Sequence, residues 1–290
     1  MAPVRAPPLN DRPLEPGLYV VSTPIGNLRD ITLRALDILA GADLVLAEDT
    51  RVAGKLLGAF GIKAKVRRYD DHTGEAARPG ILAALREGSR IALTTDAGAP
   101  LVSDPGYRLV HEAVQQGSAV YPVPGASAVI AGLTAAGLPT DRFLFVGFPP
   151  TRSAARRSFL AELLPIRATL VIFEGASRLG ESLKDMAEVL GPRPAAVARE
   201  LTKLHETTIR GPLDVLAADP KLQAPKGEIV VIVGQGAVVE SSPADAEAAL
   251  REALIRLGPA DAASEVSKAL GLPRRDLYRR AVELKSGGGR

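Results

Sequence analysis

The sequence predicts an α/β protein with two sheet-containing domains and a helical C-terminal extension. Between residues 17 and 138, short apolar runs alternate about five times with segments of helical spacing, which favours a parallel sheet with helices on both faces. Between residues 139 and 236 the apolar runs follow one another more closely, which indicates a second domain with a mixed sheet. Residues 243–286 carry only helical spacing, and residues 1–16 are expected to be a flexible lead-in.

The segment 90–128 contains two strand-to-loop transitions. An apolar run at 91–95 opens into a loop rich in Gly and Pro, and Asp104-Pro105 is expected to begin a helix. A second strand breaks at Pro124-Gly125, before a helix that begins at Ser127. Ligands of open α/β sheets bind at the carboxyl ends of the strands, where glycines allow close approach to the backbone. These two loops are therefore expected to form a binding site.

Two further strands of the first domain also end in polar loops. Residues 17–23 form the first strand, and a loop with Pro24 and Asn27 follows it before a helix that Asp30 is expected to cap. Residues 43–48 are nearly all apolar and predict a strand buried on both faces. The charged side chains that follow that strand are expected at the same sheet edge as the Gly-rich loops.

The second domain and the extension show different spacing. In the second domain, strands are expected at 143–148, 168–173, 195–201, 206–209 and 228–233, with helices at 152–164 and up to residue 190. Residues 240–242 are expected to be a linker, and Pro243 begins a new helix. After it come two short helices around a turn at 271–273, with arginines on the second, which resemble a helix-turn-helix.

Composition excludes several classes of protein. The 290 residues include no cysteine, which excludes disulfides and thiolate metal sites, and the scattered His72, His111 and His205 predict no zinc site. The sequence has no apolar stretch long enough to cross a bilayer, and the lead-in lacks the apolar core of a signal peptide, so a cytoplasmic location is expected. The net charge of +3 does not by itself indicate nucleic acid, but residues 274–290 are the most basic segment.

The common nucleotide-site and hydrolase motifs are absent, because GxxxxGK[ST], GxGxxG and GxSxG do not occur. The loops at the strand ends instead carry Asn27, Asp49, Arg51, Asp96, Asp104 and Ser127. Backbone amides, carboxylates and close-approach glycines suit a polar, cationic or zwitterionic small ligand. On spacing alone, Asp96 is more often a helix or turn residue than a ligand contact, and the glycines are also compatible with ordinary turns, so residue types leave both interpretations open.

A series of motifs resembles the tetrapyrrole (corrin/porphyrin) methylase superfamily in order and spacing: TPIGNLRDITLRAL, LAEDTR, TDAGAPLVSDPG, VPGASA and RELTKLHE. TPIGNLxD together with SDPG is similar to the branch that methylates a cytidine 2′-hydroxyl in 16S ribosomal RNA. The resemblance runs from about residue 17 to 233, and the basic helical tail is similar to that branch too. The chain reads PGASA at 124–128 where the family usually reads PGPSA, which keeps the backbone contacts and loses one rigid proline.

The resemblance implies a homodimer of two-domain α/β chains, with S-adenosylmethionine (SAM) held in the cleft between the domains. Carried over by position, the cofactor contacts would be Pro24, Asp96, Ala97, Gly98, Leu101, Ser127, Ala128, Phe173, Leu201, Lys226 and Gly227. Asp96 is the expected partner for a polar end of the cofactor. The backbone-rich character of this set agrees with the glycine-rich loops.

A ribose 2′-hydroxyl is a poor nucleophile, so a base or a group that stabilises the emerging alkoxide is expected. The candidates are Asn27, Glu48, Asp49 and Arg51 from the first domain, with Arg199, Glu200 and Lys203 from the second. Each is a hypothesis, because charged residues after strands are also common as solvated caps.

Contact with RNA is expected at two basic segments, which contain Arg152, Arg156 and Arg157 in the first and Arg274, Arg275, Arg279 and Arg280 in the second. Aromatic residues make up only 4% of the chain, so base stacking on an aromatic platform is not expected. Two alternatives stay open: a SAM-dependent methyltransferase for a tetrapyrrole or other small molecule, and a non-catalytic RNA-binding assembly protein. The basic tail argues against the first, and the shaped loops argue against the second.

Overall fold

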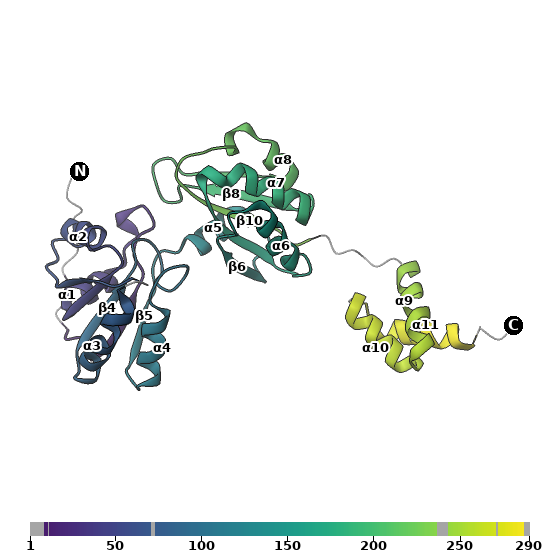
Figure 1. Ribbon diagram of the computed structural model, residues 1–290, viewed down its shortest axis with the longest axis horizontal. Helices are drawn as coiled ribbons and strands as arrows, with labels where there is room; N and C mark the ends of the chain where they lie inside the picture. The colour runs from purple at the N-terminus through teal and green to yellow at the C-terminus, as the bar shows by residue number, and fades with distance from the viewer. Residues whose placement is uncertain (1–8, 11, 71–72, 237–242, 271, 287–290) are drawn as a thin grey trace. The chain divides into compact units, whose positions relative to one another are not determined.

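The computed structural model describes residues 9–10, 12–70, 73–236, 243–270 and 272–286. The chain divides into two compact units, Met1–Gly236 and Ala237–Arg290 (Figure 1). The first unit contains two five-stranded sheets, and the second contains helices. His72, Gly271 and the expected linker at 240–242 lie outside the described residues.

The first sheet is parallel, as predicted, with strand order β3-β2-β4-β1-β5. Its strands are β1 (Gly17–Val21), β2 (Leu44–Ala47), β3 (Val66–Arg68), β4 (Arg90–Thr94) and β5 (Val120–Val123). All residues of β2 are buried, which confirms the prediction from its apolar run. β1 lies between β4 and β5, so the loops after these strands begin side by side.

Helices cover both faces of this sheet. On one face, α1 (Leu33–Gly41) and α2 (Thr50–Ala59) pack Leu36 and Leu57 against Val45 of β2. On the other, α3 (Gly74–Arg86) and α4 (Tyr107–Gln115) pack Ile81 and Leu109 against Leu46. Alternate residues of one strand thus enter two separate cores, which is the arrangement predicted by the alternation of strands and helices.

Two expected helix starts were wrong. Asp30 lies in the 3-10 turn η1 (Leu28–Asp30), and α1 is capped by Thr32, whose hydroxyl accepts the Ala35 N–H at 3.1 Å. Asp104 lies two residues before the N-cap of α4, which is Gly106 at φ 124°. In both cases the residue at the N-cap lies two positions further along the chain, so the helix begins later than predicted.

The second sheet is mixed, as predicted, with order β6-β7-β10-β8-β9, of which only β6 and β7 pair in parallel. Its strands are β6 (Phe143–Gly147), β7 (Thr169–Gly175), β8 (Pro194–Arg199), β9 (Thr207–Pro212) and β10 (Glu228–Val233). Its helical segments are α5 (Ala128–Ala136), α6 (Ser153–Leu163), η2 (Ala176–Arg178), α7 (Leu179–Leu190), α8 (Leu213–Ala218) and η3 (Pro220–Leu222).

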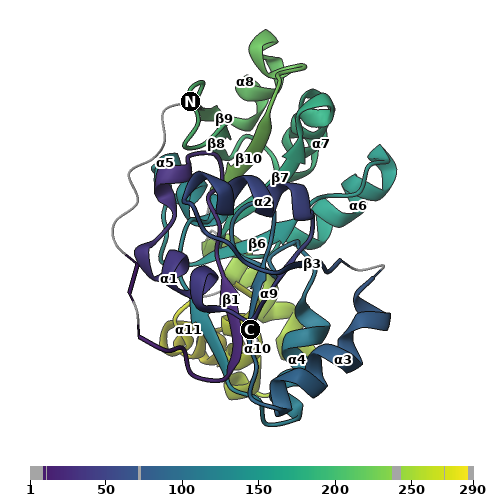
Figure 2. The same ribbon diagram turned by 90° about the vertical axis from the view of Figure 1, so that its left-hand side faces the viewer.

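Helix α5 packs on one face of the second sheet, and α6, α7 and α8 pack on the other (Figure 2). Gly132 of α5 lies so close to β10 that a Cβ there would be 3.0 Å from Val230 Cγ1. Ile25, from the loop after β1, belongs to the same core as α5. The loop after β1 and the helix after β5 therefore link the first sheet to the second.

The described part of the lead-in lies against the first sheet. Leu14 packs on the core formed by α1 and α2, and the Tyr19 hydroxyl donates to the Glu15 carbonyl at 2.7 Å. Residues near 14 and 15 are thus held by the fold, whereas a flexible segment was expected.

The second unit consists, in its described residues, of α9 (Pro243–Arg256), α10 (Pro259–Leu270) and α11 (Arg274–Ser286). The three helices share a small core of alanines with Leu250, Val266 and Leu277. Arg280 of α11 forms an ion pair with Glu247 of α9 at 2.5 Å, which fixes these two helices together. Among the described residues of the whole chain, no helix is long and apolar enough to cross a membrane.

Candidate active site

The loops after β1, β4 and β5 meet at the carboxyl edge of the first sheet. Thr23 donates its N–H to the carbonyl of Gly98 at 2.8 Å and accepts the Gly98 N–H at 3.1 Å. A Cβ on Gly125 would lie 2.9 Å from Ser22 Cβ, so the third loop passes the first at a distance that only glycine allows. The three loops therefore form one continuous surface.

Strained backbone is concentrated in the loops of this region. In the described part of the chain, the non-glycine residues with positive φ are Leu101 and Ser103 (73° and 64°) in the loop after β4, and Glu200 and Thr202 (54° and 65°) in the loop after β8. Such conformations cost about 1–3 kcal/mol each and gather at functional sites. Both domains of the first unit thus contribute a strained loop.

A cavity of about 380 Å³ lies beside these loops, and we call it the cofactor cavity. Its volume is typical of small-ligand sites, about 300–1,000 Å³. Of the expected cofactor contacts, Ala97, Gly98, Ser127, Ala128, Phe173 and Gly227 line it. Ser127 also caps α5, because its hydroxyl accepts the Ile130 N–H, so a helix N-terminus opens beside the cavity.

The other expected contacts do not line the cofactor cavity. Pro24 and Asp96 line a neighbouring cavity of about 530 Å³, which we call the α2 cavity. Leu101 packs against the core formed by α3 and α4, Leu201 is buried in the core around α5, and the Lys226 carbonyl accepts a hydrogen bond from Arg199. These three residues lie near the site and support its walls.

The cofactor cavity also contains residues that sequence reasoning did not assign to the cofactor, among them Ser103, Asp104, Phe148 and Glu228. Phe148 and Phe173 meet edge to face, with ring centroids 5.5 Å apart. Asp104 was expected to start a helix rather than to contact the cofactor. The SDPG motif that contains it was the signal that could have placed it in the loop after β4. The cavity combines an aromatic wall, backbone amides at a helix start and a carboxylate, which fits SAM with its adenine ring and positive charges.

Three carboxylates, Glu48, Asp96 and Asp104, form an acidic cluster at this edge. Burial, and then the charges of Asp104 and Asp96, raise the pKa of Glu48. Burial raises the pKa of Asp104, against a hydrogen bond from Thr95, and the charge of Asp96 raises it further. The three carboxylates therefore repel one another when they are charged. A bound cationic ligand would reduce this repulsion.

The acidic cluster predicts opposite pH dependences for stability and for SAM affinity. A carboxyl whose pKa is raised by folding binds its proton more tightly in the folded state, so the free energy of unfolding decreases as pH rises above about 4. The affinity for a cation increases over the same range, because the carboxylates become charged. Calorimetry of SAM binding and thermal unfolding between about pH 4 and pH 7 measure both. Asp104→Asn should flatten both profiles, and an Asp104→Asn profile as steep as the wild-type one would contradict this account.

The four catalytic candidates of the first domain, Asn27, Glu48, Asp49 and Arg51, line neither cavity. Asn27 caps η1 through its side chain, which accepts the Arg29 N–H at 3.1 Å. Asp49 caps α2 and forms an ion pair with Arg51 at 2.6 Å, and the hydrogen bonds from Arg51 hold the pKa of Asp49 far below its usual range. A carboxylate with so low a pKa is a weak general base.

Lys203 reaches the site from the second domain. Its Nζ lies 2.8 Å from Glu200 Oε1 and 3.1 Å from Glu228 Oε2, and it lines the α2 cavity with Glu228. Burial lowers the pKa of Lys203, but the two carboxylates outweigh it and raise the pKa overall. The Lys203 hydrogen bond, followed by the Glu228 N–H, lowers the pKa of Glu200. Lys203 therefore remains a cation at this edge of the cleft.

The loop from 199 to 206 is held by its own contacts. Arg199 donates to the Lys226 carbonyl at 3.2 Å and to the Thr207 hydroxyl at 3.2 Å, and it lines neither of the two cavities. A Cβ on Gly26 would lie 2.4 Å from Lys203 Cγ, so the lysine stem crosses the loop after β1 at a glycine. Arg199 shapes the loop, and Gly26 makes room for Lys203.

The first segment that was predicted to bind RNA exposes less unpaired positive charge than its sequence suggests. Arg156 is buried, with 1% of its side chain exposed, and it pairs with Asp185 of α7 at 2.6 Å. Arg157 pairs with Glu188 at 2.5 Å. Arg156 is therefore a structural residue that a phosphate cannot reach, which corrects its expected role. Of the three arginines predicted in this segment, only Arg152 is exposed without a partner among the described residues.

The tail arginines also fall into two groups. Arg279 pairs with Asp276 at 3.2 Å, and Arg280 pairs with Glu247 and Glu283. Arg274 and Arg275 are exposed at the start of α11 and have no ion-pair partner among residues 243–270 and 272–286. The start of α11 thus carries two adjacent arginines without an ion-pair partner in the described part of this unit.

The fold is that of a methyltransferase that uses SAM. A family model described as "Tetrapyrrole (Corrin/Porphyrin) Methylases" matches residues 17–217, and another, described as "RsmI C-terminal HTH domain", matches residues 240–285. The chain belongs to the tetrapyrrole methylase family and, within it, to the branch of ribosomal RNA small subunit methyltransferase I.

Relatives support this placement over nearly the whole chain. Ribosomal RNA small subunit methyltransferase I of Mesorhizobium japonicum is 50% identical over 96% of this chain and 95% of its own length. The protein of the same name from Escherichia coli O157:H7 is 44% identical over 92% of this chain and 94% of its own length. The crystal structure of uroporphyrin-III-C-methyltransferase from Thermus thermophilus is similar with a TM-score of 0.53 and 25% identity, over 75% of this chain and 93% of that chain.

Proposed function

We propose that the chain transfers a methyl group from SAM to the ribose 2′-hydroxyl of a cytidine in the 16S RNA of the small ribosomal subunit, in the cytoplasm. The observation that carries the proposal is the 50% identity to a ribosomal RNA small subunit methyltransferase I over 96% of this chain, since such an alignment spans the methylase fold and the helical unit together. The cavities described above supply a place for the cofactor and for the acceptor.

SAM supplies a methyl group that is already activated on a sulfonium. The chain's own residues have to hold the reactants in line and exclude water. The backbone around Gly98 and the helix start at Ser127 would hold the polar end of the cofactor, and Phe148 with Phe173 would cover its ring. The acidic cluster would balance its positive charge.

Lys203 is the residue that we propose to stabilise negative charge on the ribose oxygen while the hydroxyl proton passes to solvent water and the sulfonium leaves as the thioether of S-adenosylhomocysteine. Its pairing with Glu200 and Glu228 fixes the ammonium group beside the α2 cavity and keeps it protonated. Glu200 in turn is fixed by the Glu228 N–H at 3.0 Å. In this proposal Asn27, Asp49 and Arg51 hold the loops of the first domain in place and do not contact the methyl acceptor.

The methyl acceptor distinguishes the proposed function from a tetrapyrrole methyltransferase. Tritium transfer from labelled SAM is measured onto small ribosomal subunits and, in parallel, onto a precorrin. Label in 16S RNA, recovered as 2′-O-methylcytidine after nuclease digestion, is the expected result. Label in the precorrin alone would favour the small-molecule enzyme, and the absence of SAM binding by calorimetry would favour a non-catalytic RNA-binding protein.

The start of α11 is expected to contact the RNA backbone. Replacing both Arg274 and Arg275 by alanine should weaken binding to small subunits and reduce the slope of log affinity against log salt by roughly 2, because two phosphate contacts are lost. SAM affinity should not change. Filter binding at several salt concentrations measures the slope. Arg256→Ala is the matched control, because Arg256 lies in the same unit but is paired with Glu265. An equal slope for the double variant and the control would exclude this contact.

The proposed enzyme is a homodimer. Large apolar side chains on α4 support an interface there, since 66% of Tyr107 and 56% of Val114 are exposed to solvent in the single chain. Sedimentation velocity of the full chain tests the proposal, and a purely monomeric species at micromolar concentration would contradict it.

A further inference from the structure

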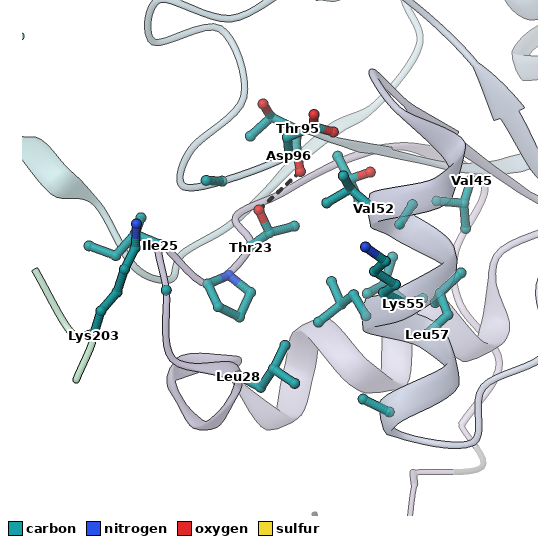
Figure 3. A pocket seen from close by; sticks show the side chains of 18 of the residues that line it. Thr23, Ile25, Leu28, Val45, Val52, Lys55, Leu57, Thr95, Asp96 and Lys203 are labelled. Atoms are coloured by element: carbon teal, nitrogen blue, oxygen red, sulfur yellow. Dashed lines mark hydrogen bonds between the residues drawn. The ribbon is translucent and has the colours of Figure 1, made fainter. Parts of the chain in front are cut away.

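The α2 cavity lies between helix α2 and the loop that follows β1. Leu28 lies on one side of it, and Val52, Lys55 and Leu57 of α2 lie on the facing side (Figure 3). Pro24 and Leu56 also line the cavity. The cavity has a volume of about 530 Å³, which is large enough for a nucleoside. Of its lining residues, only Pro24, Asp96 and Ala97 were expected to contact the cofactor.

The α2 cavity and the cofactor cavity meet at shared residues. Ile25, Ala97 and Glu228 line both of them. Methyl transfer needs the acceptor oxygen and the donor carbon within about 3–3.5 Å in one line. A ligand in the α2 cavity would therefore present its reactive atom at the one boundary where the two cavities touch, next to Glu228 and its partner Lys203.

The lining of the α2 cavity suits a flat, partly polar ring. Most of its walls are apolar, which favours a base over a hydrated phosphate. Lys55 is its only lining cation, apart from Lys203, among the described residues, and it forms no hydrogen bond or ion pair in the described part of the chain. Lys203 is fixed by Glu200 and Glu228 at the end of the cavity where the ribose is proposed to lie, so Lys55 is the lining cation left to bind the base.

We propose that the α2 cavity holds the target nucleoside after it has turned out of the RNA, with the base between the 24–28 loop and α2, and with Lys55 donating a hydrogen bond to a ring acceptor of the base. Cytosine offers O2 and N3 as acceptors on its pairing edge. In this arrangement the ribose lies at the junction with the cofactor cavity. The inference rests on the proposed RNA methylation and adds the position and the recognition of the acceptor.

Two variants of α2 test the inference kinetically. Lys55→Met keeps an unbranched side chain, one atom shorter, without the charge, and Val52→Trp fills the cavity from the half-exposed side of the helix. Each should lower kcat/KM for small subunits by about 10- to 100-fold, as expected for the loss of a charged hydrogen bond or of the binding space. Lys63→Met, an exposed lysine outside both cavities, is the control and should retain wild-type turnover. All three should bind SAM as the wild type does.

A binding measurement separates this inference from the proposed function. Cytidine 5′-monophosphate at millimolar concentration, added to the full chain with S-adenosylhomocysteine, should shift the methyl NMR signals of Leu28 and Val52 and leave distant Val215 unchanged. Wild-type kcat/KM in both α2 variants, or no shift at Leu28 and Val52, would overturn the inference. A wild-type chain that binds the nucleotide at these methyls but transfers no label to small subunits would instead contradict the proposed function.

Discussion

Replacing Arg156 by alanine is expected to lower the free energy of unfolding by about 3–5 kcal/mol, because it leaves the buried Asp185 carboxylate with only the more distant Arg157, at 3.9 Å, as a cationic partner. Only 1% of the Arg156 side chain and 8% of the Asp185 side chain are exposed, and the two groups are 2.6 Å apart. The guanidinium also donates to the Thr151 carbonyl at 3.1 Å, so the same substitution frees the start of α6. Urea denaturation of the full chain measures the loss.

The neighbouring arginine provides the control for this prediction. Arg157 is half-exposed, pairs with Glu188 at the surface and lies 3.9 Å from Asp185, which keeps the closer Arg156, so Arg157→Ala should cost only about 0–1 kcal/mol. If Arg156→Ala were as stable as Arg157→Ala and bound small subunits more weakly, Arg156 would be an RNA contact after all, and its buried position would be wrong.

Replacing Ala128 by phenylalanine is expected to weaken SAM binding by at least about 100-fold, which corresponds to about 2.7 kcal/mol. Ala128 is the first residue of α5 and lines the cofactor cavity, so an aromatic ring there takes up the space that the ligand needs. The cap at Ser127 is unchanged, and the helix should still form. Isothermal calorimetry with SAM measures the loss.

Thr134→Phe places the same ring on the same helix, at an exposed position outside both cavities. It should bind SAM with wild-type affinity. Equal affinities for Ala128→Phe and Thr134→Phe would show that the cofactor does not use the cavity beside α5. Thermal unfolding of both variants distinguishes a filled cavity from an unfolded domain, since only the latter loses the cooperative transition.

The sequence was sufficient to predict the layers of the fold. The apolar run of β2 and the helical spacing on either side of it require a parallel sheet with two covered faces, and the structure has one. The start of a helix at Ser127 was also predicted correctly, and the structure shows Ser127 as its N-cap. Helix starts failed at Asp30 and Asp104 because Thr32 and Gly106 lie two residues later, and spacing cannot rank two capping residues so close together.

Sequence reasoning located the site loops but not the residues that neighbouring elements bring to them. Lys55 lies on the exposed side of α2, and in sequence it is indistinguishable from any solvated helical lysine. Arg156 lies in a helix that is basic in sequence, yet its partner Asp185 is 29 residues away on α7. Burial and pairing of this kind depend on tertiary contacts, which neither composition nor periodicity contains.

The claim on which this account depends is that the loops after β1, β4 and β5 hold the cofactor together with the second domain. The most direct measurement is a crystal structure of the full chain with S-adenosylhomocysteine. The ligand is expected in the cofactor cavity, in contact with Gly98, Ser127 and Phe173. A ligand bound elsewhere, for example in the cavity lined by Val197 and Thr207, with these three residues untouched, would contradict the account.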